Sequence, residues 1–561
     1  MGGPASSRAA GRQPRGRTIA ARPDEHGLPR RTTGPARLLG PSCGGRGSRR
    51  KLVDVPPLEA QHTRARRSAL EPRLPKDLVA VRSTAMFIDG AWCEAASGET
   101  FPATNPATGQ VIANDAKGSR EDAGQAVAAA IAARRGWQRT SAFERAAALE
   151  RVAANIDARR DQLAEALTLD QGKPLQAEAY GEVEELLVYF RMAAADATRL
   201  DGLMPPSVDP NKRVLIYRVP MGVVGVITPW NWPYTMPAEM IAPAFAGGNT
   251  VVWNPATLTS YCASVLASCI ADADFPPGVF NLVTGPGSEV GDELAGHPDV
   301  AAIGFIGSTS TGRRIAERAI GKELLLEMGG NGPLVILKDA DLDAAVKATL
   351  TACFLNAGQS CTAGEWILVD HQIHGDFLER LTAAMGRDTR LGDPLDPRTT
   401  MGPLNNEATA AKTERHVAQA IAEGAVVVLG GSRSPEFGSP LFYQPTVLTG
   451  VKREMQIARE ETFGPVAPIT RIDGIEEAID IVNASAFGLL NAIFTRDLRA
   501  GIHFAESVRA GWVNITEGTN YRESHLPFGG RAGSQSGMGR VGGRFSIERL
   551  TEMKTVILNL A

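Results

Sequence analysis

The sequence has few cysteines and lacks the groupings that cysteine-based sites require. Six occur in 561 residues, with no C-x-x-C pair and no histidines at the spacing of zinc ligands. These absences argue against a disulfide scaffold or a metal site and fit a reducing compartment, so we expect a cytoplasmic protein without a metal. No apolar run is long enough to cross a membrane, and we expect no membrane partner.

Negative charge is scarce at the N-terminus and abundant in the rest of the chain. Residues 1–85 hold 18 Lys and Arg against 6 Asp and Glu, whereas the remaining residues hold 41 against 56. The acidic remainder argues against a nucleic-acid partner. The first 85 residues, rich in Arg, Gly, Pro and Ser, are predicted to be a disordered basic leader. One alternative is a transit peptide, although Pro and Gly oppose an amphipathic helix; another is that Met86 is the natural start.

The remaining chain is too long for one core and alternates between strand and helix patterns. Apolar residues at helical spacing fill residues 121–200. Short apolar runs then alternate with helical patterns such as 262–272; the runs are 213–218, 223–227, 250–253, 279–283 and 302–306. This alternation predicts an α/β fold with a parallel sheet covered by helices. The chain ends in another predicted strand, 554–558.

Cys361 is the candidate nucleophile. It follows small or polar residues that allow an exposed loop, between a helical pattern at 344–355 and a predicted strand at 366–369. A thiol at such a loop tip can reach a substrate and backbone N–H donors. The alternative is a buried structural cysteine, and this segment alone does not decide between them.

A glycine-containing loop, residues 307–312, follows one predicted strand and opens a predicted helix at 311–319. Glycine lets the backbone approach a pyrophosphate, and a helix start offers free N–H donors. A plain strand–helix turn is the alternative, because the pattern differs from G-x-G-x-x-G.

Five motifs in order resemble those of the aldehyde dehydrogenase superfamily from Met86 to the C-terminus: residues 228–233, 307–312, 326–330, 358–361 and 461–465. The separation of 34 positions from Glu327 to Cys361 also resembles the family's spacing. The resemblance implies a Rossmann-like parallel-sheet cofactor domain, a second α/β catalytic domain and a small β oligomerisation element. Their expected ranges are 86–202 with 222–328, 329–544, and 203–221 with 545–561. It also implies a homodimer or homotetramer.

By resemblance, the chain oxidises an aldehyde to the acid with NAD(P)⁺. The Cys361 thiolate attacks the aldehyde carbon, and the Asn231 amide with the Cys361 backbone N–H stabilises the oxyanion. Hydride transfer to the cofactor leaves a thioester, which water activated by Glu327 releases. The alternatives are a coenzyme-A-acylating relative, which typically lacks that base, and a catalytically silent structural relative.

The resemblance also implies the cofactor residues. Glu461 is expected to hold the nicotinamide ribose and Ser308 the pyrophosphate. The full expected set is Thr228, Trp230, Asn254, Gly307, Ser308, Gly312, Glu461 and Phe463, although Trp230 can equally be a core residue. Asn254 stands where the family usually has Lys, and Thr257 where NAD-preferring members often have Glu. NAD is expected, with NADP possible.

The loop from Asn514 to Pro527, which closes the substrate tunnel in the family, is polar. Arg522 and His525 can meet the carboxylate of a semialdehyde, whereas Glu517 and Glu239 can favour a cationic aminoaldehyde. These charges can also face solvent or pair with each other. The sequence therefore predicts only a preference for short or polar aldehydes over long apolar ones.

Overall fold

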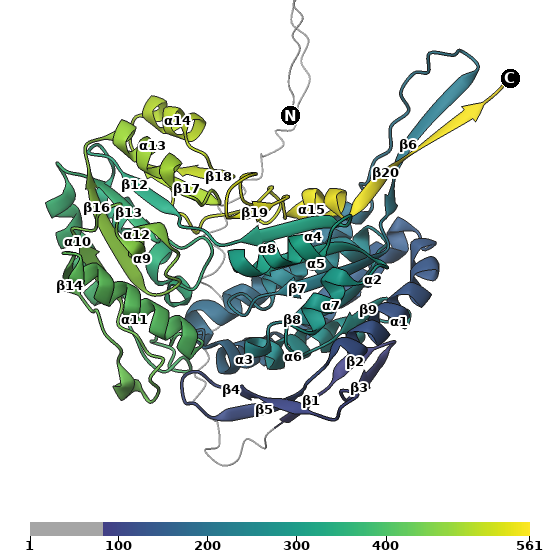
Figure 1. Ribbon diagram of the computed structural model, residues 1–561, viewed down its shortest axis with the longest axis horizontal. Coiled ribbons are helices and arrows are strands. Elements are labelled where there is room, and N and C mark those ends of the chain that lie inside the picture. Colours follow the sequence, from purple (N-terminus) through teal and green to yellow (C-terminus); the bar gives the residue numbers. More distant parts are fainter. Residues whose placement is uncertain (1–81) are drawn as a thin grey trace, which may run out of the picture. The chain divides into compact units, whose positions relative to one another are not determined.

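The structure is a computed structural model that describes residues 82–561, within a unit running from Asp77 to Ala561 (Figure 1). The predicted leader therefore lies outside the described residues, except for its last four. Of these, Arg82–Thr84 form strand β1, which pairs in parallel with Val111–Ala116, strand β5. The folded part thus begins before Met86.

The first large sheet has eight strands in the order β19-β11-β10-β7-β8-β9-β2-β3. The five from β11 to β9 are parallel, as predicted, while β19 and the β2–β3 hairpin add antiparallel edges. In chain order the strands are Met86–Ile88 (β2), Ala91–Cys93 (β3), Val223–Thr228 (β7), Thr250–Pro255 (β8), Phe280–Leu282 (β9), Val300–Gly307 (β10), Glu323–Met328 (β11) and Gly537–Met538 (β19). β19 pairs here although its residues fall in the range expected for the catalytic domain.

Helices cover both faces of this sheet because its strands are apolar on both sides. In β7, Val224 and Val226 join one core and Val223 and Ile227 another, as the two-residue period of a strand requires. α5 packs against β7 and β8 from the first side, and α1 packs against them from the second. The helices of this part are Arg120–Gln138 (α1), Ala142–Ala158 (α2), Arg160–Gln171 (α3), Tyr180–Ala197 (α4), Thr235–Ala246 (α5), Ser260–Ala271 (α6), Val290–Gly296 (α7) and Thr309–Arg318 (α8), with short turns at Leu175–Ala179 (η2) and Thr257–Thr259 (η3).

The second large sheet has seven strands in the order β14-β15-β16-β13-β12-β17-β18, parallel except for edge strand β14. They are Pro333–Ile336 (β12), Trp366–Asp370 (β13), Val426–Leu429 (β14), Thr446–Thr449 (β15), Val466–Ile472 (β16), Leu490–Phe494 (β17) and Trp512–Ile515 (β18).

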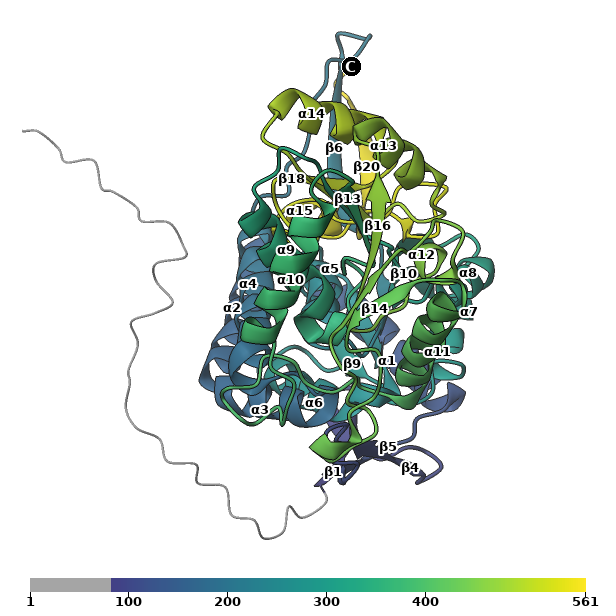
Figure 2. The same cartoon turned by 90° about the vertical axis from the view of Figure 1, so that its left-hand side faces the viewer.

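The helices of this second part share one core with its sheet, and α9 and α10 lie side by side (Figure 2). They are Leu342–Phe354 (α9), His374–Asp388 (α10), Glu407–Ala422 (α11), Gln456–Arg459 (α12), Ile475–Ala484 (α13) and Leu498–Ser507 (α14), with turns at Leu355–Gly358 (η4) and Pro435–Phe437 (η5).

Two small sheets complete the described chain. Thr100–Thr104 (β4) joins β5 and β1. Lys212–Pro220 (β6) pairs antiparallel with Thr551–Asn559 (β20), which follows Gly543–Arg549 (α15), and the two strands form an arm that projects from the neighbouring helices (Figure 1). Within residues 82–561 no helix is long and apolar enough to cross a membrane.

Candidate active site

The carboxyl ends of neighbouring parallel strands bring the predicted site residues together. β7 ends at Thr228 and β10 at Gly307, and Glu327 is the penultimate residue of β11. Ile306 stands opposite Glu327, and Gly307 opposite Met328, in the β10–β11 register. Loops that leave this edge can therefore face a common ligand, as open parallel sheets usually allow.

The segment before Cys361 has an unusual backbone. After α9, Asn356 and Ala357 have φ values of +51° and +52°, and Gly358 has +74°. A Cβ on Gly358 would lie 2.1 Å from the carbonyl oxygen of Gly464, so the close approach of the two chains requires glycine. Left-handed backbone at two non-glycine residues persists only where surrounding contacts hold it.

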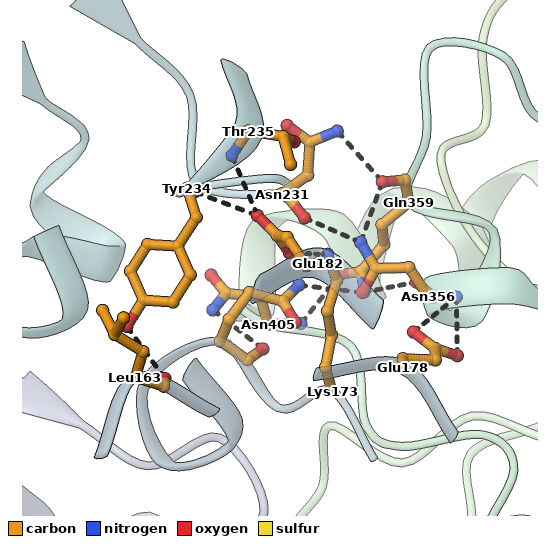
Figure 3. A network of polar contacts seen from close by, with 11 residues as sticks. Leu163, Lys173, Glu178, Glu182, Asn231, Tyr234, Thr235, Asn356, Gln359 and Asn405 are labelled. Atoms are coloured by element: carbon orange, nitrogen blue, oxygen red, sulfur yellow. Dashed lines mark hydrogen bonds and ion pairs between the residues drawn. The ribbon is translucent and has the colours of Figure 1, made fainter. Parts of the chain in front are cut away.

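Buried polar groups supply those contacts (Figure 3). The Asn356 backbone N–H donates to both carboxylate oxygens of Glu178, at 3.0 and 3.1 Å. The Asn356 side-chain amide donates to the Asn231 carbonyl at 2.9 Å, and the Asn231 amide donates to the Gln359 carbonyl at 3.1 Å. Hydrogen bonds thus join the segment that carries Asn231 to the segment that carries Cys361.

A second buried acid, Glu182, holds the segment after Asn231 (Figure 3). Its carboxylate accepts from the backbone N–H groups of Tyr234, at 2.9 Å, and Thr235, at 3.4 Å. Its other oxygen pairs with Lys173 at 2.5 Å, and both charged side chains are fully buried. Burial raises the pKa of Glu178 to about 7, although the nearby Lys173 ammonium opposes that rise. Removing either Lys173 or Glu182 would leave the charge of the other buried and uncompensated.

Cys361 and Glu327 line two cavities at once, each of about 210 Å³. Burial raises the pKa of Glu327 to about 8. Burial and the neighbouring Glu327 carboxyl raise the pKa of the Cys361 thiol well above its ordinary value. Both groups therefore carry a proton near neutral pH in the resting structure. Cys361 is partly exposed but does not stand at the open loop tip that its sequence suggested.

One cavity contains most of the expected cofactor residues. Glu461 presents its carboxylate there, with one oxygen accepting from the Gly330 N–H at 3.0 Å. The Trp230 and Phe463 rings meet edge to face at 5.6 Å. The residues that line this cavity are Pro229, Trp230, Asn231, Met236, Ile306, Gly307, Ser308, Glu327, Gly329, Cys361, Thr409, Lys412, Glu461 and Phe463.

Three of the expected cofactor residues do not line this cavity. Thr228 accepts a hydrogen bond from the Trp253 indole at 2.8 Å. Asn254 is buried, and its amide donates to the carbonyls of Val283 and Gly285 at 3.0 and 3.2 Å. Gly312 is a packing residue, because a Cβ there would lie 2.1 Å from the sulfur of Met328. Through these two hydrogen bonds Asn254, near the end of β8, holds the segment that follows β9.

The groups around the cavity that contains Glu461 suit a dinucleotide. Ser308 caps α8 by accepting from the Thr311 N–H at 3.4 Å, so the start of this helix faces the end of β10 with backbone donors for a pyrophosphate. The Glu461 oxygen that Gly330 does not use can accept from ribose hydroxyls. In residues 82–561 no group of three or more His, Cys, Asp or Glu side chains could hold a metal ion.

The other cavity is lined by Glu239 and Arg522, two of the four charged residues expected at the substrate side, but not by Glu517 or His525. Arg522 lies there, but it is paired with Glu239 and Glu185, so the pairing considered from the sequence is the arrangement found. His525 is exposed beside Glu523. The full lining is Glu185, Trp232, Thr235, Met236, Glu239, Ile306, Glu327, Leu355, Ser360, Cys361, Thr362, Asn520, Arg522 and Phe528.

Sequence reasoning missed the buried acids that position the site. Besides Glu178 and Glu182, Glu365 accepts from the backbone N–H groups of Thr462 and Phe463, at 2.5 and 2.6 Å. It thereby holds Phe463 at a φ of +63° beside Glu461. Acidic residues on predicted helices are usually solvated, and no local pattern distinguished these.

The chain resembles known proteins along most of its length. The sequence model of the aldehyde dehydrogenase family matches residues 92–556. A 3-sulfolactaldehyde dehydrogenase of Pseudomonas putida is 39% identical over 84% of this chain and 96% of its own length. A betaine aldehyde dehydrogenase of Bacillus subtilis (strain 168) is 38% identical, over 85% and 98%. A solved structure, the NAD-dependent aldehyde dehydrogenase from Sinorhizobium meliloti, superposes with a TM-score of 0.83 at 37% identity, over 86% of this chain and 96% of the other. The chain therefore belongs to the aldehyde dehydrogenase family.

Proposed function

We propose that the protein is a hydrolytic, NAD(P)-dependent aldehyde dehydrogenase with Cys361 as nucleophile and Glu327 as base. The observation that carries this proposal is the position of these two groups on the wall shared by the two cavities. A carbonyl carbon entering from the substrate side meets the thiol, and a hydride acceptor reaches the same carbon from the cofactor side. Bound NAD(P)⁺ supplies that hydride acceptor.

In the first step the Cys361 sulfur attacks the aldehyde carbon and the thiol proton passes to solvent water. The carbonyl oxygen becomes an oxyanion, which the Asn231 amide and the Cys361 backbone N–H stabilise; each such donor contributes on the order of 3 kcal/mol. Asn231 is suited to this role because the bonds to Asn356 and Gln359 orient it.

Loss of hydride from the oxyanion carbon converts the thiohemiacetal into a thioester on Cys361. Glu327 acts as a carboxylate next to the acyl carbon once its own proton has passed to solvent water. It takes a proton from water, whose oxygen forms the new C–O bond as the C–S bond breaks. The acid and the free thiol result.

We propose Trp230, Gly307, Ser308, Glu461 and Phe463 as the nicotinamide and pyrophosphate contacts. Lys412, which the sequence did not indicate, also lines this cavity and lies 5.9 Å from the centre of the Phe463 ring. Thr228, Asn254 and Gly312 support the backbone around the site. NAD is the proposed cofactor, and a comparison of KM for NAD⁺ and NADP⁺ tests the preference.

The β6–β20 arm is the proposed oligomerisation element, and residues 86–202 with 222–328 and 329–544 are the proposed cofactor and catalytic domains. Met204, Met553 and Ile557 are each more than half exposed on or beside the arm. Such exposed apolar side chains favour a second copy of the chain. Light scattering on the purified protein distinguishes monomer, dimer and tetramer. A cytoplasmic location stays the expectation from the scattered cysteines.

NADH and NADPH formation with propanal, with and without coenzyme A, tests the activity. Turnover without coenzyme A, with propanoate as product, supports the hydrolytic enzyme. A requirement for coenzyme A identifies an acylating enzyme. No reduction of either cofactor by propanal or by other aldehydes would show that the chain is a silent relative.

A further inference from the structure

The substrate-side cavity contains a buried cluster of charges that the proposed chemistry does not use. Arg522 Nη2 pairs with Glu239, lies 3.5 Å from Glu185 and donates to the Tyr189 hydroxyl at 2.7 Å. The Tyr189 hydroxyl in turn donates to Glu239. The Arg522 guanidinium also lies over the Phe528 ring, 5.0 Å from its centre. Glu185, Glu239 and Arg522 line the cavity, and Tyr189 is hydrogen-bonded to the last two.

The elements that carry the cluster hold it rigidly. Glu185 and Tyr189 are four residues apart on α4, so they share one face of that helix. Glu239 lies on α5, in which every residue is buried. Arg522 comes from the loop after β18. Because Glu239 is only 2% exposed, water cannot replace Arg522 as the partner of its carboxylate.

The charges of the cluster do not balance. Two carboxylates face one guanidinium, so the wall carries an excess negative charge when all three are ionised. Glu239 is the closer partner of Arg522, and Glu185 is the more exposed acid, with 33% of its side-chain area accessible. Every contact of Arg522 with these two acids and with Tyr189 is made by Nη2, which holds the guanidinium against Glu239. Glu185, the weaker partner of Arg522, lines the cavity and can accept from a cation that enters it.

We propose that Glu185 and Glu239 make this cavity selective for a short aldehyde that carries an ammonium group, with Arg522 acting as their structural counter-ion. The inference rests on the proposed function. An ammonium group entering the cavity gains a charge-assisted contact with Glu185. A carboxylate in the same place meets the excess negative charge of the two acids, which opposes its binding.

Three aldehydes of the form OHC–CH₂–CH₂–X test the proposal: 3-aminopropanal, butanal and succinic semialdehyde. Their reacting ends are identical and their tails differ in charge, with similar size. We expect kcat/KM to fall in that order, with 3-aminopropanal at least tenfold above succinic semialdehyde and most of the difference in KM. Equal values, or a lead for succinic semialdehyde, would overturn the proposal. So would a lead for butanal with both charged aldehydes tenfold below it.

Two variants locate the effect. Glu185→Gln is expected to lower the ratio of 3-aminopropanal to succinic semialdehyde at least fivefold, and its part-exposed position favours normal folding. Glu239→Gln releases Arg522 and is expected to raise kcat/KM for succinic semialdehyde. Glu517→Gln is the matched control, because Glu517 is exposed on the same loop and does not line the cavity.

An unchanged ratio in folded Glu185→Gln would refute the role of Glu185 even if the native preference is as expected. No reduction of NAD⁺ or NADP⁺ with any of the three aldehydes would instead refute the proposed function, and the inference with it. Turnover of butanal with the order of the charged aldehydes reversed would refute the inference alone.

Discussion

The role of Glu327 can be tested through pH, because burial raises its pKa to about 8. If ionised Glu327 activates water in the step that limits turnover, about a tenth of the enzyme is competent at pH 7 and about nine tenths at pH 9. We therefore expect kcat to rise roughly tenfold over this interval. In Glu327→Gln the rise should disappear, and kcat should fall by about 10² to 10⁴.

Stopped-flow measurement of NADH separates the two steps. Glu327→Gln should show a burst of one NADH per active site followed by slow release of the acid. A burst-free trace with a slow first turnover would refute the assignment to water activation and place Glu327 at activation of the Cys361 thiol. A pH-independent kcat in the native enzyme would refute the argument from burial.

The same pKa has an opposite consequence for stability. The unfolded carboxyl titrates near 4.5 and the folded one near 8, so the contribution of Glu327 to stability is complete below pH 4.5 and is lost as the pH rises through 8. The difference corresponds to at most about 5 kcal/mol. Glu327→Gln should therefore lose less Tm than the native protein between pH 6 and 9, although it is nearly inactive. A parallel loss of Tm in both proteins would contradict this.

Three further predictions concern the nucleophile, its support and the N-terminus. Cys361→Ala should abolish turnover while NAD⁺ affinity, measured by calorimetry, stays within a few-fold; turnover near the native rate would refute its role. Glu178→Ala leaves the Asn356 N–H unpaired and should destabilise the folded protein by about 1 to 3 kcal/mol in urea unfolding, with slower alkylation of Cys361. Glu178→Gln, which keeps one acceptor oxygen, is the matched control, and equal effects of the two would contradict the clamp. A chain beginning at Met86 lacks β1 and its Thr84–Asp115 hydrogen bond, so its Tm should lie below that of a chain beginning at Asp77, with activity retained by both; equal Tm values would show that β1 contributes nothing.

Local patterns predicted the secondary structure and the α/β class because both depend on near neighbours along the chain. The predicted strand at 302–306 lies inside β10, and the predicted helix at 262–272 overlaps α6 within two residues. Periodicity identifies these elements since a strand buried on both faces is continuously apolar, and a helix is apolar every three to four residues. The antiparallel edges of the first sheet had no such signal, since β19 contains only Gly537 and Met538.

The sequence by itself, through its ordered motifs, determined the family and the candidate nucleophile, base and amide. It did not determine how these groups are held or what surrounds them. Glu178 and Asn356 are 178 residues apart, and Glu239 and Arg522 are 283 residues apart. Whether such a charge is solvated, buried as a clamp or neutralised in a substrate cavity depends on which distant segment packs against it. A carboxylate looks the same in the sequence in all three cases; only tertiary packing, by removing water from Glu178, Glu239 and Glu327, gave each its own surroundings.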